Sequence, residues 1–150
     1  MQRQRVHNIK QKLCQIAPAV FGESPVLFAY LYGSYAKGVA HAFSDLDVGI
    51  FVEKLDVKAC LELELSVGLR IDEKLDHMVQ SDVRVINRLP LVVKGRILSE
   101  GELIYSIAED KRVEFETQVR MAYFDFLPVL LQYREAYKQE LLSRRANGVY

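Results

Sequence analysis

Several features are scarce in this sequence, and each absence argues against a class of protein. The 20 Lys and Arg residues balance the 20 Asp and Glu residues, so the formal net charge is zero. Because a general nucleic-acid binder needs a basic surface to displace counterions, we expect no general nucleic-acid binding. No apolar run approaches the ~20 residues that cross a bilayer, so we expect no membrane association. The basic N-terminal stretch lacks the apolar core of a signal peptide.

Cysteine is also scarce. The chain has two cysteines, Cys14 and Cys60, and their spacing fits neither a metal site nor a redox motif. Both lie in helical patterns, so we expect two buried free thiols. Free thiols are typical of a reducing compartment, and we expect a cytoplasmic protein.

The residue patterns that are present predict one domain in which helices and strands alternate. A length of 150 residues is enough to bury a core. Turn residues cluster at Pro18, Gly22 and Pro25, and Pro128 is expected to kink or break the last helix. Helices are expected over residues 3–17, 55–76, 88–99 and 108–145, and strands over residues 26–32, 44–53, 77–86 and 102–107, the last of these at an edge. This order predicts a mixed α/β or α+β domain with a C-terminal helical extension.

The predicted helix over residues 55–76 has a plausible N-cap at Asp56. Its leucines recur at helical spacing and alternate with charged residues. The apolar positions are Leu61, Leu65 and Leu69, and the charged ones are Glu62, Glu64, Arg70 and Glu73.

Two carboxylates enter the second predicted strand, in the stretch YGSYAKGVAHAFSDLDVGIFVE over residues 32–53. Asp45 and Asp47 are two residues apart, and in a strand such side chains point to the same face. Buried carboxylates are normally neutralised by a cation. Oxygen ligands suit Mg²⁺, which accepts substrate phosphates among its remaining ligands. The pair is therefore a candidate site for metal-assisted displacement at phosphorus.

A Gly-Ser pair lies ten residues before Asp45 and fits the same chemistry. Gly33 lets the backbone approach a ligand closely. A short helical turn is expected over residues 34–37, stopped by Gly38, and it directs N–H groups at an anion. The Ser34 hydroxyl adds a donor, and Lys37 lies where it can reach a phosphate. We also expect Ser44, directly before Asp45, to contact the nucleotide.

The third predicted strand offers one further carboxylate, Asp82. Metal-dependent phosphoryl chemistry usually recruits such a group from a neighbouring strand. Arg84 lies two residues on and shares its face. It either neutralises the carboxylates, contacts a phosphate or forms a structural ion pair. The alternative for the motif as a whole is structural, because most single Asp-x-Asp pairs are solvated or cap a turn.

Gly33-Ser34, ten intervening residues and Asp45-Leu46-Asp47 resemble the signature of the polymerase-β-type nucleotidyltransferase superfamily. One helix before the first strand and Asp82 on a third strand resemble its minimal nucleotidyltransferase (MNT) branch. The resemblance covers roughly residues 1–106. It implies a small mixed sheet of about four strands flanked by helices. We expect a nucleotidyltransferase domain over 1–106 and a helical extension over 107–150 that packs on the domain or a partner.

The MNT resemblance also implies a function. Proteins of this branch are typically antitoxins of HEPN ribonuclease toxins, and they transfer AMP from ATP to a tyrosine hydroxyl of the toxin with release of pyrophosphate. By resemblance, Gly33 and Ser34 bind the triphosphate, Asp45 and Asp47 hold two Mg²⁺, and Asp82 is the third carboxylate at the metals and the acceptor hydroxyl. The alternatives are a non-catalytic antitoxin that covers its partner, and nucleotidyl transfer to a small molecule.

The C-terminal segment is rich in apolar residues between positions 119 and 142. A patch of this size indicates either an interaction surface or a helix that folds back onto the core. The chain is too short for the second domain that holds the acceptor in larger nucleotidyltransferases. We therefore expect the acceptor to lie on another molecule, a HEPN protein.

Overall fold

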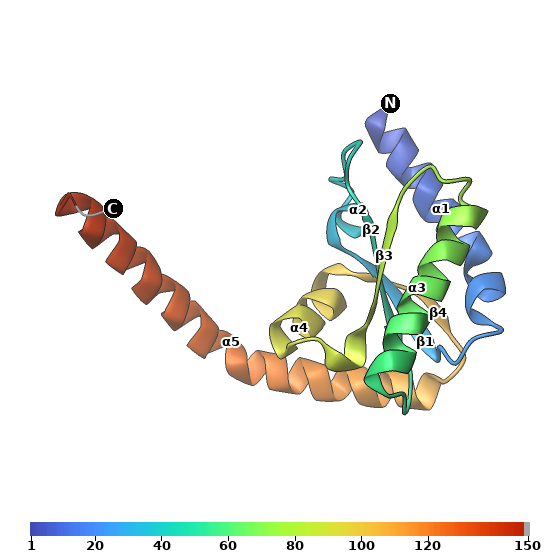
Figure 1. Ribbon diagram of the computed structural model, residues 1–150. Helices are drawn as coiled ribbons and strands as arrows, with labels where there is room; N and C mark the ends of the chain where they lie inside the picture. The colour runs from blue at the N-terminus through green and yellow to red at the C-terminus, as the bar shows by residue number, and fades with distance from the viewer. Residues whose placement is uncertain (149–150) are drawn as a thin grey trace.

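The computed structural model describes residues 1–148 and is built on a four-stranded mixed sheet in the order β3-β2-β1-β4 (Figure 1). β1 pairs with β2 and β4 in antiparallel fashion, and β2 pairs with β3 in parallel. The strands are β1 Phe28–Tyr32, β2 Leu46–Phe51, β3 Ser81–Val85 and β4 Glu102–Ser106. The helices are α1 Gln2–Phe21, α2 Gly33–Lys37, α3 Val57–Lys74, the short η1 Ile86–Arg88, α4 Leu91–Glu100 and α5 Glu109–Ala146. The expected α+β sheet of about four strands is confirmed, with β4 at an edge.

The sheet separates two hydrophobic cores because successive strand residues point to opposite faces. Ala29 and Leu31 of β1 pack under α1 and α3, whereas Phe28 and Tyr30 pack under α4 and α5. The faces of β2 divide in the same way. Its odd-numbered positions, including Asp47, therefore belong to the α4/α5 side.

The first helix corrects two predictions. Pro18 does not begin a turn, because α1 continues through it to Phe21. Proline removes one helical N–H donor, and the carbonyl left without it belongs to the exposed residue Cys14, where water can satisfy it. The second correction concerns the two thiols, both of which the sequence predicts to be buried. Cys60 is buried, but Cys14 lies on the outer face of α1 beside the buried Leu13 and is exposed.

In α3, the side chains that face the core are not the leucines whose helical spacing is visible in the sequence. Its buried side chains are those of Cys60, Leu63, Val67 and Ile71. Leu61, Leu65 and Leu69 face solvent instead. The predicted N-cap is confirmed, because the Asp56 carboxylate accepts the Ala59 N–H at 2.7 Å.

The third strand is shorter than predicted and lies at the free edge of the sheet. It begins at Ser81, so residues 77–80 form no strand. Carboxylates of α3 cover part of its edge. Asp72 accepts the Ser81 N–H at 2.8 Å, and Glu64 accepts the Val85 N–H at 2.9 Å. These two backbone donors are thus satisfied by side chains.

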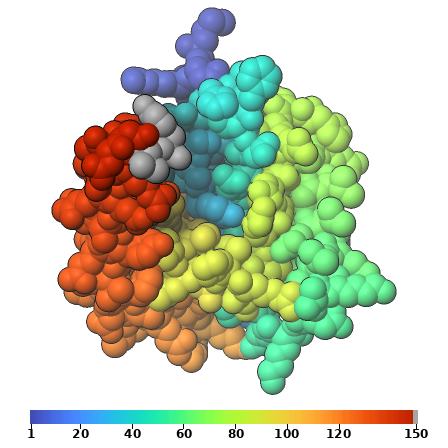
Figure 2. Space-filling view, turned by 60° about the vertical axis from the view of Figure 1, so that its left-hand side comes forward, coloured from blue at the N-terminus to red at the C-terminus, as the bar shows by residue number. Residues whose placement is uncertain are grey.

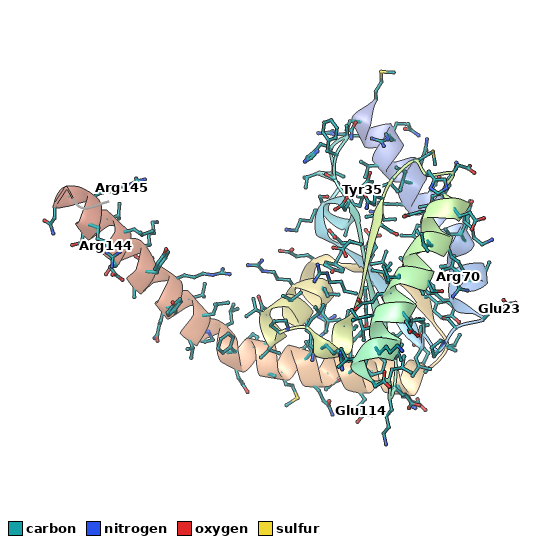
Figure 3. All side chains as sticks on the ribbon, in the orientation of Figure 1. Glu23, Tyr35, Arg70, Glu114, Arg144 and Arg145 are labelled. Carbon is teal, nitrogen blue, oxygen red and sulfur yellow. The ribbon has the colours of Figure 1, made fainter. Side chains whose placement is uncertain are left out.

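The last helix is one continuous element that contains Pro128, so the proline does not break it. Figure 1 shows a change of direction near its middle, as expected where a proline removes a helical hydrogen bond. Its first half is anchored to the domain, since the Tyr30 hydroxyl donates to Glu116 at 2.8 Å and Val119 is buried. The second half projects away from the sheet, with Arg144 and Arg145 near its end (Figure 3). Within residues 1–148, no helix is long and apolar enough to cross a membrane.

Candidate functional site

The site begins where β1 runs directly into α2. Gly33 is the first residue of that turn and has φ +71°, a left-handed conformation that favours glycine. A Cβ atom at this position would overlap the Asp47 carboxylate. Gly38 ends α2 with φ +73°, as the sequence predicted. Glycine at position 33 therefore brings the turn of α2 into direct contact with an acidic side chain of β2.

Asp47 lies at the centre of the site. Its register partners are Tyr32 of β1 and Asp82 of β3, so all three side chains lie on the α4/α5 face of the sheet. Desolvation and the charges of Asp82 and Asp45 raise the pKa of Asp47 to about 6, while Arg84 opposes the rise. The charges of two further carboxylates thus act on Asp47.

Asp45 differs from its predicted placement inside the strand. β2 begins one residue later, at Leu46, and the Asp45 side chain is exposed. Its charge nevertheless acts on Asp47. The sequence was therefore right to associate the two carboxylates, although only one of them belongs to the ladder.

Asp82 forms an ion pair with Arg84, for which the sequence left three alternative roles open. Arg84 Nε lies 3.4 Å from Asp82 Oδ1, and both side chains are substantially exposed. The ion pair raises the pKa of Arg84. Arg84 thus neutralises part of the negative charge of the site in the unliganded chain.

Tyr32 is a site residue that sequence reasoning missed. It is half-buried, and desolvation followed by the charges of Asp47 and Asp82 raises its pKa to about 12. Its hydroxyl stays protonated at neutral pH and is a hydrogen-bond donor beside the carboxylates. The only available signal was its position directly before Gly33 at the end of a buried strand.

Two predicted nucleotide contacts have other partners in the structure. Lys37 of α2 forms an ion pair with Glu100 of α4 at 2.9 Å, where both side chains are about half exposed. The Ser44 hydroxyl accepts the His41 N–H at 2.9 Å and closes the turn before Asp45. Their roles toward a nucleotide stay predictions, as does that of the Ser34 hydroxyl.

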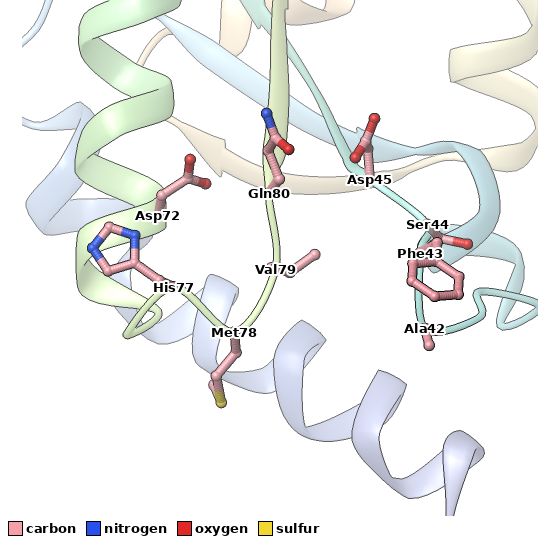
Figure 4. A pocket seen from close by; sticks show the side chains of 9 residues that line it. All are labelled: Ala42, Phe43, Ser44, Asp45, Asp72, His77, Met78, Val79 and Gln80. Carbon is pink, nitrogen blue, oxygen red and sulfur yellow. The ribbon is translucent and has the colours of Figure 1, made fainter.

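Asp45 also lines a surface pocket, which lies between the turn before β2 and the loop before β3 (Figure 4). Asp45, Asp72 and Gln80 give it a polar side, and Phe43 and Met78 give it an apolar one. The pocket reaches Asp45 but neither Asp47 nor Asp82. Figure 2 also shows a hollow, bordered by the segment between α2 and β2 and by α4, with the outer part of α5 beside it in this view.

The donor set fits a hard divalent cation. Mutual repulsion among the carboxylates is the condition that a bound cation relieves. Among residues 1–148, no three His, Cys, Asp or Glu side chains are gathered into a ready-made metal cage. Mg²⁺ is usually held by one or two carboxylates together with substrate phosphates, so this arrangement is compatible with Mg²⁺ arriving with a nucleotide.

The small mixed sheet, the Gly-Ser turn and the acidic side chains around Asp47 define a nucleotidyltransferase-type domain. A family model described as "Polymerase beta, Nucleotidyltransferase" matches residues 15–110, and the chain belongs to this family. A search of curated proteins found no match to the sequence.

Solved structures of the same fold include chains of toxin–antitoxin complexes. A chain of a toxin–antitoxin crystallised with AMP-PNP is 20% identical with a TM-score of 0.58, over 87% of this chain and 98% of that one. A chain of an MntA-HpeT toxin–antitoxin mutant is 17% identical with a TM-score of 0.61, over 86% and 98%. A chain from Shewanella oneidensis is 14% identical with a TM-score of 0.55, over 87% and 96%. At these identities the likeness establishes the fold, which is the fold expected for the MNT branch.

Proposed function

We propose that the chain is an antitoxin that transfers AMP from ATP, with Mg²⁺, to a hydroxyl group of a HEPN-family protein. The observation that carries this proposal is the contact of three elements around Asp47. The Gly33 turn touches its carboxylate, Asp82 is its ladder partner, and the charge of Asp45 acts on it. A phosphate-binding turn and a cation-binding cluster therefore meet at one point.

The residues have distinct roles in the proposed reaction. Gly33 and Ser34 bind the triphosphate, and Asp45 and Asp47 hold the cation. Bound Mg²⁺ supplies positive charge that neutralises the phosphates. Asp82 orients the acceptor hydroxyl or accepts its proton, once Arg84 has released it.

The bonds in the transfer balance as follows. The acceptor oxygen attacks the α-phosphorus of ATP, the bond from that phosphorus to the bridging oxygen breaks, and pyrophosphate leaves. The proton of the hydroxyl passes to a carboxylate of the site. The proposed acceptor is a hydroxyl on another protein.

The comparisons support the nucleotide and the partner. A chain of the same fold was crystallised in a toxin–antitoxin with AMP-PNP, an ATP analogue. Another comes from a complex called MntA-HpeT. The proposed division into a transferase domain over 1–106 and an extension over 107–150 fits the long helix α5, which begins at Glu109.

The test is to incubate the chain with α-labelled ATP, Mg²⁺ and the protein encoded by the adjacent gene. We expect label on the partner, an increase of one or more AMP masses and release of pyrophosphate. The Asp45→Asn/Asp47→Asn double variant should abolish the transfer. The matched control is Asp110→Asn/Asp125→Asn, which removes the same charge from exposed positions of α5.

Other outcomes assign a different function. Neutralisation of the partner by the Asp45→Asn/Asp47→Asn variant, without transfer, would mean that the chain acts by covering its partner. Transfer of AMP that needs no protein acceptor would mean that the substrate is a small molecule. Either result refutes the proposed reaction.

A further inference from the structure

The long helix α5 carries an apolar seam that starts inside the protein and continues beyond it. Spacings alternate between four and three residues, which is the repeat by which one helix packs along another. The seam residues are Val119, Tyr123, Phe126, Leu130, Tyr133 and Tyr137.

The first two seam residues already form a helix–helix contact within the chain. Val119 is buried, and the ring of Tyr123 occupies the space in which a Cβ atom at Gly95 of α4 would lie. The seam therefore begins as a real interface, and the glycine allows the two helices to approach closely.

The later seam residues have no such cover. Phe126, Tyr133 and Tyr137 are 37%, 69% and 55% exposed. An aromatic side chain has about 150–250 Å² to bury, so at these exposed fractions the three rings offer roughly 240–400 Å², up to about half of the ~800 Å² that each partner contributes to a standard interface. The exposed Val129, Leu131, Leu141 and Leu142 add to this area, so the uncovered part of α5 is a substantial interaction surface.

The apolar face is wider than a single pair of helices requires. Leu127, Val129 and Leu141 flank the seam, where a two-stranded coiled coil usually carries charged residues. Apolar flanks are typical of a helix that packs against more than one neighbour in a bundle. The shape of the face therefore indicates a partner that presents two helices.

The helix α5 and the candidate site lie on the same side of the sheet. α5 packs on the sheet face that carries Asp47 and Asp82. In Figure 1 the outer half of α5 continues away from the domain beyond α4. A protein bound along the outer half of α5 would therefore lie on the side of the sheet that carries the site.

We infer that the outer half of α5, residues 126–141, is the docking surface for the helices of the acceptor protein and holds that protein at the site. This inference rests on the proposed function. Within residues 126–141, Arg134 and Lys138 are balanced by Glu135 and Glu140, and Arg144, beyond this surface, pairs with Glu140. The docked helices are therefore expected to bind through apolar side chains rather than through net charge.

A second copy of this chain is a poorer occupant. In an antiparallel two-fold pair, residues near the axis approach their own copies. Arg134 lies beside the seam near the middle of the outer half, so such a pair would bring two guanidinium groups together. A single copy of α5 would also leave part of the wide apolar face uncovered.

The test compares two double variants that add the same charge to α5 of the full chain. Tyr133→Asp/Tyr137→Asp places carboxylates on the seam. Gln132→Asp/Gln139→Asp places them on the opposite side of the helix, and all four positions are exposed. Affinity for the co-expressed product of the adjacent gene is measured by calorimetry, and unfolding by circular dichroism verifies that each variant folds.

We expect the seam variant to bind at least about 100-fold more weakly than the unmodified chain, because two aromatic anchors are lost and charge is buried in their place. The opposite-side variant should bind within about threefold. Equal affinities of the two variants, or no binding of the unmodified chain, overturn the inference. So does a dimer of the chain alone, in sedimentation velocity, that only the seam variant dissociates.

The outcome is separable from that of the proposed reaction. Asp45→Asn/Asp47→Asn should keep the complex while losing AMP transfer. If the complex forms through the seam but no AMP is transferred by the unmodified chain, the docking surface stands and the proposed reaction fails.

Discussion

Asp47 of β2 and Asp82 of β3 are direct partners in the parallel ladder at one edge of the sheet. Direct ladder partners on one face lie side by side, and two like charges in that position repel each other. The structure compensates in part through Arg84, which pairs with Asp82. Desolvation and the remaining repulsion together raise the pKa of Asp47, and the rise has measurable consequences.

Replacing Asp47 with Asn should stabilise the chain above about pH 7. The raised pKa, about 6, means that the folded carboxyl holds its proton more tightly than the unfolded one. Protonation therefore favours the folded state at acid pH, and this contribution is lost as the pH rises through 6. After a discount for solvent screening of this half-exposed group, we expect a gain on the order of 1 kcal/mol at pH 8. Urea unfolding at pH 8 and pH 4 measures it.

The gain from Asp47→Asn should disappear near pH 4, where the native carboxyl is already neutral in the folded protein. Asp125→Asn, on the exposed face of α5, is the control and should change the free energy of unfolding little at either pH. A variant that is less stable than the native chain at pH 8 would contradict the electrostatic account.

Gly33→Ala should cost more stability than Gly38→Ala. Both glycines have φ near +70°, so each alanine bears a left-handed backbone penalty of about 1 kcal/mol. Only the Cβ at position 33 also meets Asp47, since nothing lies within 4 Å of a Cβ at position 38. Thermal unfolding of both variants isolates the clash as the difference between them, and equal losses would show that the turn and β2 are not in contact.

Arg84→Gln should raise the pKa of Asp47 further above 6, because the guanidinium lowers it in the native chain. The carboxyl carbon of Asp47, followed by NMR as a function of pH, reports the change directly. Lys10→Gln, which removes a cation paired with Glu102 on β4, is the control. An unchanged midpoint for Arg84→Gln would mean that the ion pair with Asp82 does not act on Asp47.

Tyr30→Phe should loosen the anchor of α5. Tyr30 is almost completely buried and its hydroxyl donates to Glu116, so its loss removes a hydrogen bond to a carboxylate that keeps only its ion pair with Arg112. We expect a decrease of about 1–3 kcal/mol in the free energy of unfolding. Tyr133→Phe, on the exposed outer half, should cost nothing measurable. Hydrogen exchange in the first half of α5 should increase only in Tyr30→Phe.

Ile71→Ala and Leu69→Ala should show, by their different losses of stability, which stripe of α3 is buried and which is exposed. Ile71 is completely buried, so its truncation should cost about 2–5 kcal/mol. Leu69 faces solvent, so its truncation should cost less than about 0.5 kcal/mol. The reverse order, measured by urea unfolding, would show that the leucine stripe packs against the domain.

Local signals in the sequence predicted the turn of the site well. Gly33, Ser34 and Gly38 define a helical turn through backbone conformation alone, and such preferences do not depend on distant parts of the chain. The acidic pair was also recognisable. Its placement was not, because the strand begins at Leu46 and the ends of elements depend on neighbouring strands.

Features that depend on tertiary packing were beyond the sequence. The facing of Asp47 and Asp82 is set by the register of two strands that are separated by a whole helix. In α3, two stripes have helical spacing, and only the position of the sheet decides that Leu63 and Val67 face inward while Leu65 does not. The sequence predicts a turn at Pro18 because a proline signal is local, whereas the packing of α1 against the core extends the helix past it.

The carboxylates of Glu64 and Asp72 have a consequence for how the molecule behaves in concentrated solution. An uncovered edge strand invites other chains to add to the sheet and to grow into fibres. Two N–H donors of β3 are already taken by these side chains, so an incoming strand would find neither donor free. The chain can therefore expose much apolar helix surface at its C-terminal end without offering this edge as a seed for aggregation.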